Sequence, residues 1–157
     1  MQTQSLRKTI HGVLTESYMV YMVCLLAGII LDGFFKINFT NVGMQYLGLA
    51  CMVLSPLLIS WAQKASRKFK HVHSLREVTP HDFMYGPYKF LQSPTHMGIF
   101  LLSLGFSLVI NSVALVLATF VAYLITHLIF IPTQQKLLKK KYGATYEAYL
   151  KKVRLSI

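Results

Sequence analysis

Three long apolar runs dominate the sequence and restrict the folds open to it. The first two, residues 17–35 and 44–62, each hold about 19 residues, enough for a helix to cross a hydrocarbon core about 30 Å thick. The third run, 97–131, is interrupted only by Asn111-Ser112. Since a chain in lipid must satisfy its backbone hydrogen bonds internally, these runs predict an all-α integral membrane protein.

Composition supports a membrane location and narrows the partners. Of 157 residues, 54% are hydrophobic and only 13% are charged, whereas soluble domains carry about one quarter charged residues. The net charge of +11 is typical of nucleic-acid binders too, but such proteins do not carry several membrane-length runs. We therefore expect no nucleic acid, and membrane lipids with anionic headgroups as the partners of the basic residues.

Cysteine and histidine usage gives no sign of a metal centre. Cys24 and Cys51 lie inside apolar runs, so neither a disulfide framework nor a cysteine-based metal site is indicated. His71, His73 and His81 could form a ligand set, but without a cysteine or a paired carboxylate they are better interpreted as part of a solvated basic loop. We expect no metal.

The runs predict a single membrane domain with four transmembrane helices. Residues 97–131 are too long for one crossing and short for two, so we expect a helical hairpin. Its first arm, 97–110, reaches only about 21 Å, which places the turn within the membrane or tilts the hairpin steeply. Amphipathic surface helices are predicted for residues 1–16 and in the tail, 132–157, which Pro132 opens and Gly143 interrupts.

The distribution of basic residues predicts how the chain is oriented across the membrane. Basic residues crowd the N-terminus, the 63–96 loop and the tail, while the first connection carries only Lys36 and the turn at Asn111-Ser112 none. The positive-inside rule predicts that both termini and the 63–96 loop face the cytoplasm. The glycosylation triplet Asn38-Phe39-Thr40 is too close to the membrane for us to expect its use.

A short loop, GPYKFLQSPTHMG at residues 86–98, concentrates the polar and backbone-restricting residues. Pro87 and Pro94 fix their own φ and push Gly86 and Ser93 out of the helical region. The loop should therefore be rigid, with several hydrogen-bonding side chains and one imidazole at the membrane boundary. These are the features of a binding site.

This loop, the hairpin and the tail QQKLLKKKYGATYEAYLKKV resemble the membrane-embedded S-adenosylmethionine-dependent methyltransferases typified by isoprenylcysteine carboxyl methyltransferase, whose pattern the phospholipid N-methyltransferases share. The family pattern is G-x-Y-R-x-x-R-H-P-x-Y-x-G, a hairpin, then E-E-x-x-L-x-x-x-F-G-x-x-Y-x-x-Y. The glycines, Tyr88 and Pro94 agree. The second arginine is Gln92, the histidine Ser93, the tyrosine His96, and the glutamate pair Gln134 and Gln135.

The resemblance implies an S-adenosylmethionine pocket facing the cytoplasm. The cofactor-binding residues it indicates are His81, Asp82, Phe83, Tyr88, Ser93, Pro94, Thr95, His96 and Gln134. Substrate-binding residues by position are Phe130, where the family has an arginine for a carboxylate, and Gln92. The lost arginine disfavours an isoprenylcysteine carboxylate and favours a lipid or small amphiphile with another headgroup.

Chemical reasoning adds a catalytic role for His96. Methyl transfer mainly requires donor and acceptor to be held in line, and His96 could serve as the base where the acceptor carries a proton. His127, alone in the hairpin, is interpreted as a helix–helix hydrogen-bonding residue.

Three functional hypotheses follow. The favoured one is a membrane methyltransferase with an atypical cofactor pocket, acting at the cytoplasmic face. The second is a catalytically inactive relative that binds a lipid or plays a structural role. The third is an unrelated four-span protein. The sequence does not indicate an oligomeric state.

Overall fold

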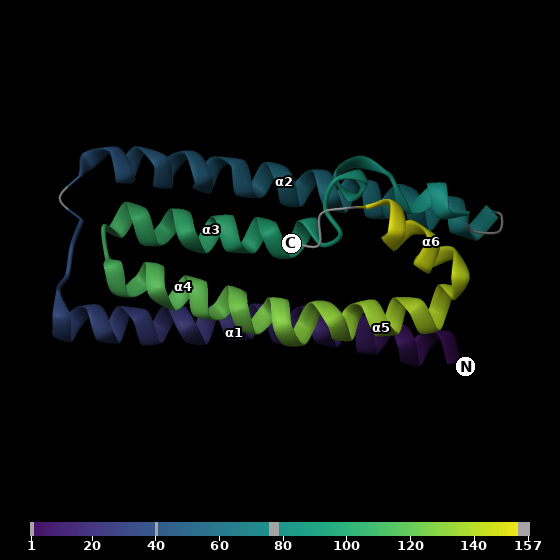
Figure 1. Cartoon of the computed structure of the whole chain (residues 1–157), viewed down its shortest axis with the longest axis horizontal. Coiled ribbons are helices and arrows are strands. Elements are labelled where there is room, and N and C mark those ends of the chain that lie inside the picture. Colours follow the sequence, from purple (N-terminus) through teal and green to yellow (C-terminus); the bar gives the residue numbers. More distant parts are fainter. Residues whose placement is uncertain (1, 40, 76–78, 154–157) are drawn as a thin grey trace.

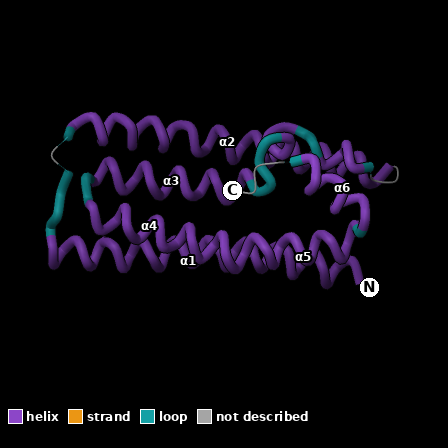
Figure 2. Tube along the Cα trace, viewed as in Figure 1, coloured by secondary structure: helices purple, strands orange, loops and turns teal. Residues whose placement is uncertain are grey.

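The protein folds into a bundle of long helices. The computed structural model describes residues 2–39, 41–75 and 79–153, and these residues are helical apart from short connections (Figures 1 and 2). The elements are α1 (Gln2–Phe35), α2 (Val42–Leu75), η1 (Pro80–Phe83), η2 (Gly86–Lys89), α3 (Pro94–Ile110), α4 (Val113–Ile125), η3 (Thr126–Phe130), α5 (Ile131–Tyr142) and α6 (Ala144–Lys152).

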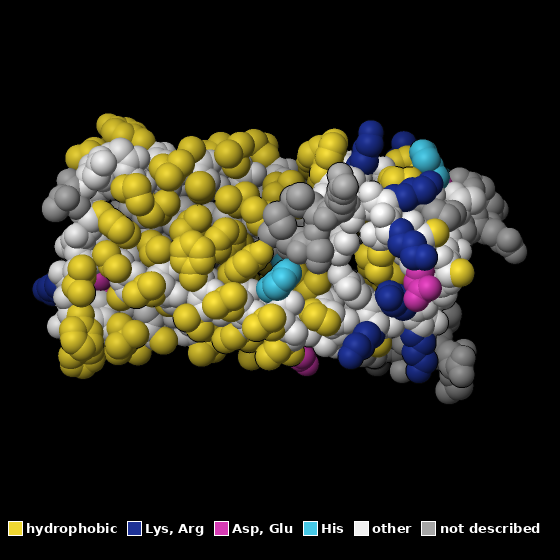
Figure 3. Space-filling view, viewed as in Figure 1, with side chains coloured by type: hydrophobic (Ala, Val, Ile, Leu, Met, Phe, Trp, Pro, Cys, Tyr) yellow, Lys and Arg dark blue, Asp and Glu magenta, His cyan; other side chains and the backbone are white. Residues whose placement is uncertain are grey.

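The surface of the bundle suits a membrane. Within the described residues, three segments are long and apolar enough to cross one: Gly12–Phe35, Val42–Lys68 and Val113–Tyr142. Large hydrophobic side chains cover the outside (Figure 3), whereas small polar ones such as Ser55 and Thr119 are buried. The predicted all-helical fold is confirmed, and its apolar exterior with buried polar side chains suits a membrane. With 17 residues, α3 reaches about 25 Å, so a fourth crossing stays a prediction.

The hairpin turn lies beside the connection between α1 and α2, at the end of the bundle. Asn111 adopts a left-handed conformation with φ of 67°, and its Nδ2 donates to the Phe39 carbonyl at 2.7 Å. The Phe39 N–H donates to the Asn111 carbonyl, and Ser112 donates to Asp32. The two connections thus share several hydrogen bonds, although Asn111 Oδ1 stays without a partner, and the turn is not isolated in the bundle interior.

Three predicted boundaries differ from those observed. Residues 1–16 are not a separate helix, since α1 runs unbroken from Gln2 to Phe35; the side chains of residues 1–11 lie outside the described set. Residues 63–75, predicted as loop, extend α2 to Leu75. The loss of hydrophobicity there marks the end of the membrane and not of the helix, because lysine, arginine, alanine and glutamine are good helix formers.

Pro132 does not open a new helix either. A π-helical segment, η3, joins α4 to α5 without a break, and the Ile131 N–H reaches back to the Thr126 carbonyl. This wider register re-pairs the backbone around a proline that has no N–H to donate. Gly143, with φ of 55°, does end α5 as predicted.

The most extensive helix contacts are between α2 and α3, followed by α1 with α4. The α2–α3 contact depends on glycine: a Cβ on Gly105 would lie 2.7 Å from the Gly48 carbonyl oxygen, and one on Gly98 would lie 2.4 Å from Ile59 Cγ1. Ser55 Oγ donates to the Gly98 carbonyl at 2.6 Å. Close approach of small residues with an interhelical hydrogen bond is a common way to join helices in lipid, and here it fixes the start of α3.

Candidate active site at the basic end of the bundle

The loop from Thr79 to Gln92 is built mainly by its own contacts and by α2. Asp82 is 1% exposed, and its Oδ2 accepts hydrogen bonds from the Thr79 N–H at 2.8 Å and from the Thr79 hydroxyl at 2.7 Å. Gly86 has φ of 59°, and a Cβ there would lie 3.0 Å from Ala65 Cβ. Asp82 therefore shapes the loop, while His81 is exposed and lies edge-on to the Tyr85 ring.

Phe83 anchors the tail on this loop. Its ring lies 5.2 Å from that of Tyr142, 5.5 Å from that of Tyr146 and 5.4 Å from that of Tyr149. The Tyr149 hydroxyl donates to the Tyr88 carbonyl at 2.9 Å. The tyrosines of the tail therefore pack against the loop and close this end of the bundle.

A glutamine pair ties α5 to the same loop. Gln135 Nε2 donates to Gln92 Oε1 at 2.8 Å, and Gln92 Nε2 donates to the Val153 carbonyl at 3.1 Å. The tail thus folds back on the loop, with the start of α5 beside the residues that precede α3. Both polar ends of the Gln92 amide are used in this chain, so Gln92 positions the loop.

The first turn of α3 projects from this scaffold. Ser93 stands at the N-cap position without a capping hydrogen bond from its side chain, and the buried Pro94 occupies the first turn. Burial raises the pKa of the Tyr88 phenol, whose hydroxyl interacts with the Thr95 side chain. His96 is 4% exposed, and its Nε2 has no hydrogen-bond partner in the structure.

Gln134, on α5, has the same property. Its Oε1 is buried without a partner, whereas the neighbouring Gln135 is paired with Gln92. A buried acceptor left unpaired costs about 1–3 kcal/mol, so each such atom calls for a partner, such as a water molecule or a polar group of a ligand. His96 and Gln134 are the two predicted site residues with this signature, while Phe130 is half-buried at the end of η3 and brings no charge.

Further buried polar atoms without partners occur where the sequence gave no functional signal. Among the described residues they are Tyr21 Oη, Thr126 Oγ1 and His127 Nδ1, together with Asn111 Oδ1 at the hairpin turn, at the opposite end of the bundle. Sequence reasoning treated His127 as a helix–helix hydrogen-bonding residue, but its Nδ1 makes no such bond. Only the spacing of His127 four residues after Tyr123, on which it stacks at 5.9 Å, could have drawn attention to it.

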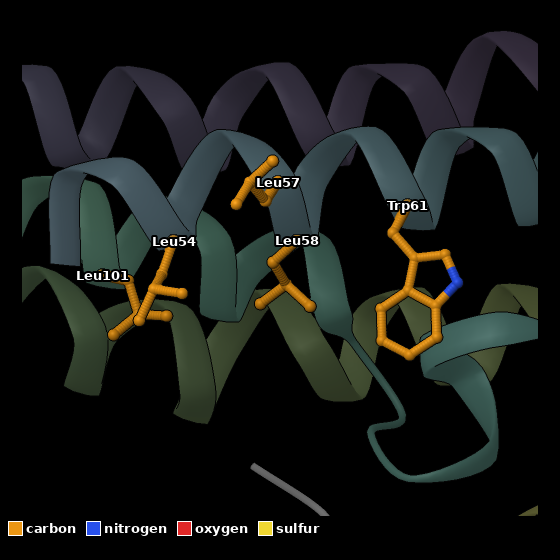
Figure 4. Close-up of a pocket in the computed structure, with 5 residues that line it drawn as sticks. All are labelled: Leu54, Leu57, Leu58, Trp61 and Leu101. Carbon is orange, nitrogen blue, oxygen red and sulfur yellow. The ribbon is translucent and has the colours of Figure 1, made fainter. Parts of the chain in front are cut away.

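Two surface hollows lie away from these residues. One, on the tail, is lined by Lys139, Glu147, Leu150 and Lys151. The other is an apolar groove on α2 and α3, with Trp61 at one end (Figure 4). Its lining residues are Leu54, Leu57, Leu58, Trp61 and Leu101. Neither hollow contains a predicted site residue, and the groove presents aliphatic surface to lipid tails.

Charge gathers at the site end of the bundle. Figure 3 shows lysine and arginine side chains concentrated beyond the hydrophobic surface, on the side where α5 and α6 lie, with a hollow at the boundary. Lys36 lies at the opposite end, where α1 finishes. Such an asymmetry attracts anionic headgroups to the surface that carries the site.

Comparison with known protein families matches residues 44–145 to the phospholipid methyltransferase family. No curated protein and no solved structure matches the chain. The matched residues begin in α2 and end in the first turn of α6, so they include the loop, His96 and Gln134, whereas α1 lies outside them. The match covers well over half of the chain, and the chain therefore belongs to the phospholipid methyltransferase family of integral membrane methyltransferases.

Proposed function

We propose that this protein is an S-adenosylmethionine-dependent methyltransferase that acts on a membrane lipid or a small amphiphile at the cytoplasmic face. The observation that carries the proposal is the pair of buried, unpartnered polar atoms, His96 Nε2 and Gln134 Oε1, at one end of a bundle of the phospholipid methyltransferase family. The apolar exterior gives a lipid acceptor direct access from the bilayer.

The residues fit the proposed cofactor. S-adenosylmethionine would supply a methyl group on a positively charged sulfur. Gln134 Oε1, a buried acceptor without a partner, suits the ammonium group of the cofactor. Ser93, Pro94, Thr95 and His96 form the first turn of α3, where free N–H groups suit a carboxylate.

Other residues shape and seal this pocket. Phe83 packs with the tail tyrosines at this end of the bundle, and this cluster would exclude water from a reaction in which charge is redistributed. Asp82 and Gln92 hold the loop through their hydrogen bonds, and Tyr88 joins the loop to α6. His81, which is exposed, is the site residue least supported by its position.

His96 would be the catalytic base. An acceptor that carries a proton must lose it when it gains the methyl group, and His96 Nε2 is free to accept a hydrogen bond at the site. Phe130 occupies the position at which the resemblance places an arginine, so the acceptor's headgroup is not held there by a cation. We therefore propose an acceptor other than a carboxylate.

A methyl-transfer assay with labelled S-adenosylmethionine tests this function. The wild-type protein in nanodiscs of mixed phospholipids, given S-adenosylmethionine labelled on its methyl group, should transfer label to the organic extract. His96→Asn should lower kcat at least 100-fold while the dissociation constant of the cofactor changes little. Cofactor binding without transfer to any lipid or amphiphile would instead favour a non-catalytic lipid-binding protein.

A further inference from the structure

Three buried polar atoms without partners lie in or beside η3, about two helical turns before Gln134. Tyr21 is 2% exposed and Thr126 is 1% exposed, and neither their hydroxyl oxygens nor His127 Nδ1 has a hydrogen-bond partner. Tyr21 comes from α1, which contacts η3, and its phenol lies beside the Thr126 side chain without the geometry of a hydrogen bond.

The unpaired state of Thr126 is unusual for this helix. Thr119 Oγ1 donates to the Leu115 carbonyl at 2.9 Å, and Thr133 Oγ1 donates to the Ile129 carbonyl at 2.6 Å. Both satisfy their hydroxyl within the helix, as threonine commonly does. Thr126 begins the π-helical segment and makes no such bond, and π-helical segments often occur at functional sites.

The position of His127 connects this cluster with His96. Rings of Phe100 on α3 and Tyr123 on α4 lie 4.7 Å apart, and the two helices are antiparallel (Figure 1). His96 lies four residues before Phe100, and His127 lies four residues after Tyr123. Residues four apart share a helix face, so both histidines lie one turn beyond this contact in the same direction, towards the basic end.

We propose that Tyr21, Thr126 and His127 form a subsite that binds the headgroup of the methyl acceptor, and that α1 thereby completes the active site. The proposal rests on the proposed methyltransferase function. Two hydroxyl oxygens and an imidazole nitrogen offer three acceptors without a permanent positive charge. They suit an amine or a hydroxyl headgroup; the two hydroxyls can also donate, but the cluster holds no lysine or arginine to neutralise a carboxylate.

The experiment starts with binding, without the cofactor. Protein labelled with ¹⁵N-histidine is placed in nanodiscs and titrated separately with dodecylamine, dodecanol and dodecanoate. The His127 imidazole signals are identified by their loss in His127→Gln. Dodecylamine or dodecanol should shift these signals and dodecanoate should not. A shift with dodecanoate alone, or with none of the three, would overturn the proposal.

Variants separate binding from a structural role. Tyr21→Phe and Thr126→Val should each weaken binding of the responding amphiphile about 5-fold, the equivalent of one hydrogen bond. Tyr18→Phe is the matched control on the same helix, since Tyr18 is 39% exposed, and should bind normally. Because the Tyr21 hydroxyl has no partner, Tyr21→Phe should leave the thermal midpoint unchanged or higher. A lower midpoint with unchanged binding would show a structural role and contradict the proposal.

The same variants distinguish this inference from the proposed function. If the wild type transfers methyl groups but Tyr21→Phe and Thr126→Val keep the wild-type KM for the acceptor, the subsite is wrong and the function stands. If the amphiphile shifts the His127 signals but no cofactor binds, the subsite stands and the methyltransferase function fails.

Discussion

Replacing Gly105 by alanine tests the packing that positions the candidate site. The new Cβ would lie 2.7 Å from the Gly48 carbonyl oxygen, 2.8 Å from Met52 Cγ and 2.9 Å from the Met52 nitrogen. Two of these atoms belong to the backbone of α2, so no side-chain rotation relieves the contact. The helices must separate by roughly half an ångström or more, and overpacking of this kind costs about 1–3 kcal/mol.

Helix propensity acts in the opposite direction and sets the net value. Alanine is favoured over glycine inside a helix by about 1 kcal/mol, so we expect Gly105→Ala to destabilise the protein by up to about 2 kcal/mol. Gly33→Ala is the matched control, because a Cβ there meets nothing within 4 Å. It should be neutral or stabilising by about 0.5–1 kcal/mol.

The two variants are compared by thermal unfolding in one detergent at one scan rate, followed by the helical circular dichroism signal. Gly105→Ala should unfold at a lower temperature than the wild type and Gly33→Ala at the same or a higher one. A gain in stability for Gly105→Ala as large as that of Gly33→Ala would refute the close α2–α3 contact, and with it the reasoning that fixes the first turn of α3.

Three further predictions concern the tail and the orientation of the chain. Tyr149→Phe removes a buried hydrogen bond to the loop and should cost about 1–2 kcal/mol in denaturant titration, whereas Tyr46→Phe, at a side chain 69% exposed, should cost nothing measurable. Burial raises the pKa of Tyr146 to about 12. Because an unfolded tyrosine ionises near pH 10, stability should be constant below about pH 10 and fall as the pH rises towards 12; a midpoint unchanged from pH 9 to 12 would contradict this. In a variant whose native cysteines are replaced by alanine, Lys151→Cys should react with an impermeant maleimide from the cytoplasmic side and Asn41→Cys from the other side, and the reverse pattern would overturn the proposed topology.

Three long apolar helices and the hairpin were predictable from the sequence, because the length of the apolar runs and the break at Asn111-Ser112 mark where these helices begin and end. Hydrophobicity and proline position also led to two wrong boundaries. The polar residues of α2 beyond Ala62 end the apolar run but not the helix, and Pro132, a strong break signal, is absorbed by the π register at Thr126. That register depends on backbone pairing, which no local composition reveals.

The candidate site was predictable where it coincides with one contiguous stretch and not where it depends on packing. The loop at 86–98 stands out because restricted and polar residues crowd together, and Gln135 does lie beside it. Tyr21 is 105 positions from Thr126 and looks like an ordinary residue of an apolar span. Only the arrangement of the helices shows that its hydroxyl is buried and unpaired.

Binding of S-adenosylmethionine to the wild type and to Gln134→Glu tests the central claim most directly. If Gln134 Oε1 faces the ammonium of the cofactor, a carboxylate at this position makes a charge-assisted hydrogen bond and should tighten binding by about 1 kcal/mol or more, about 5-fold in dissociation constant. Gln135→Glu is the control, since this side chain is paired with Gln92 and its change should not tighten binding. Calorimetry should show wild-type binding that Gln134→Glu strengthens, and no binding by either protein would contradict the account.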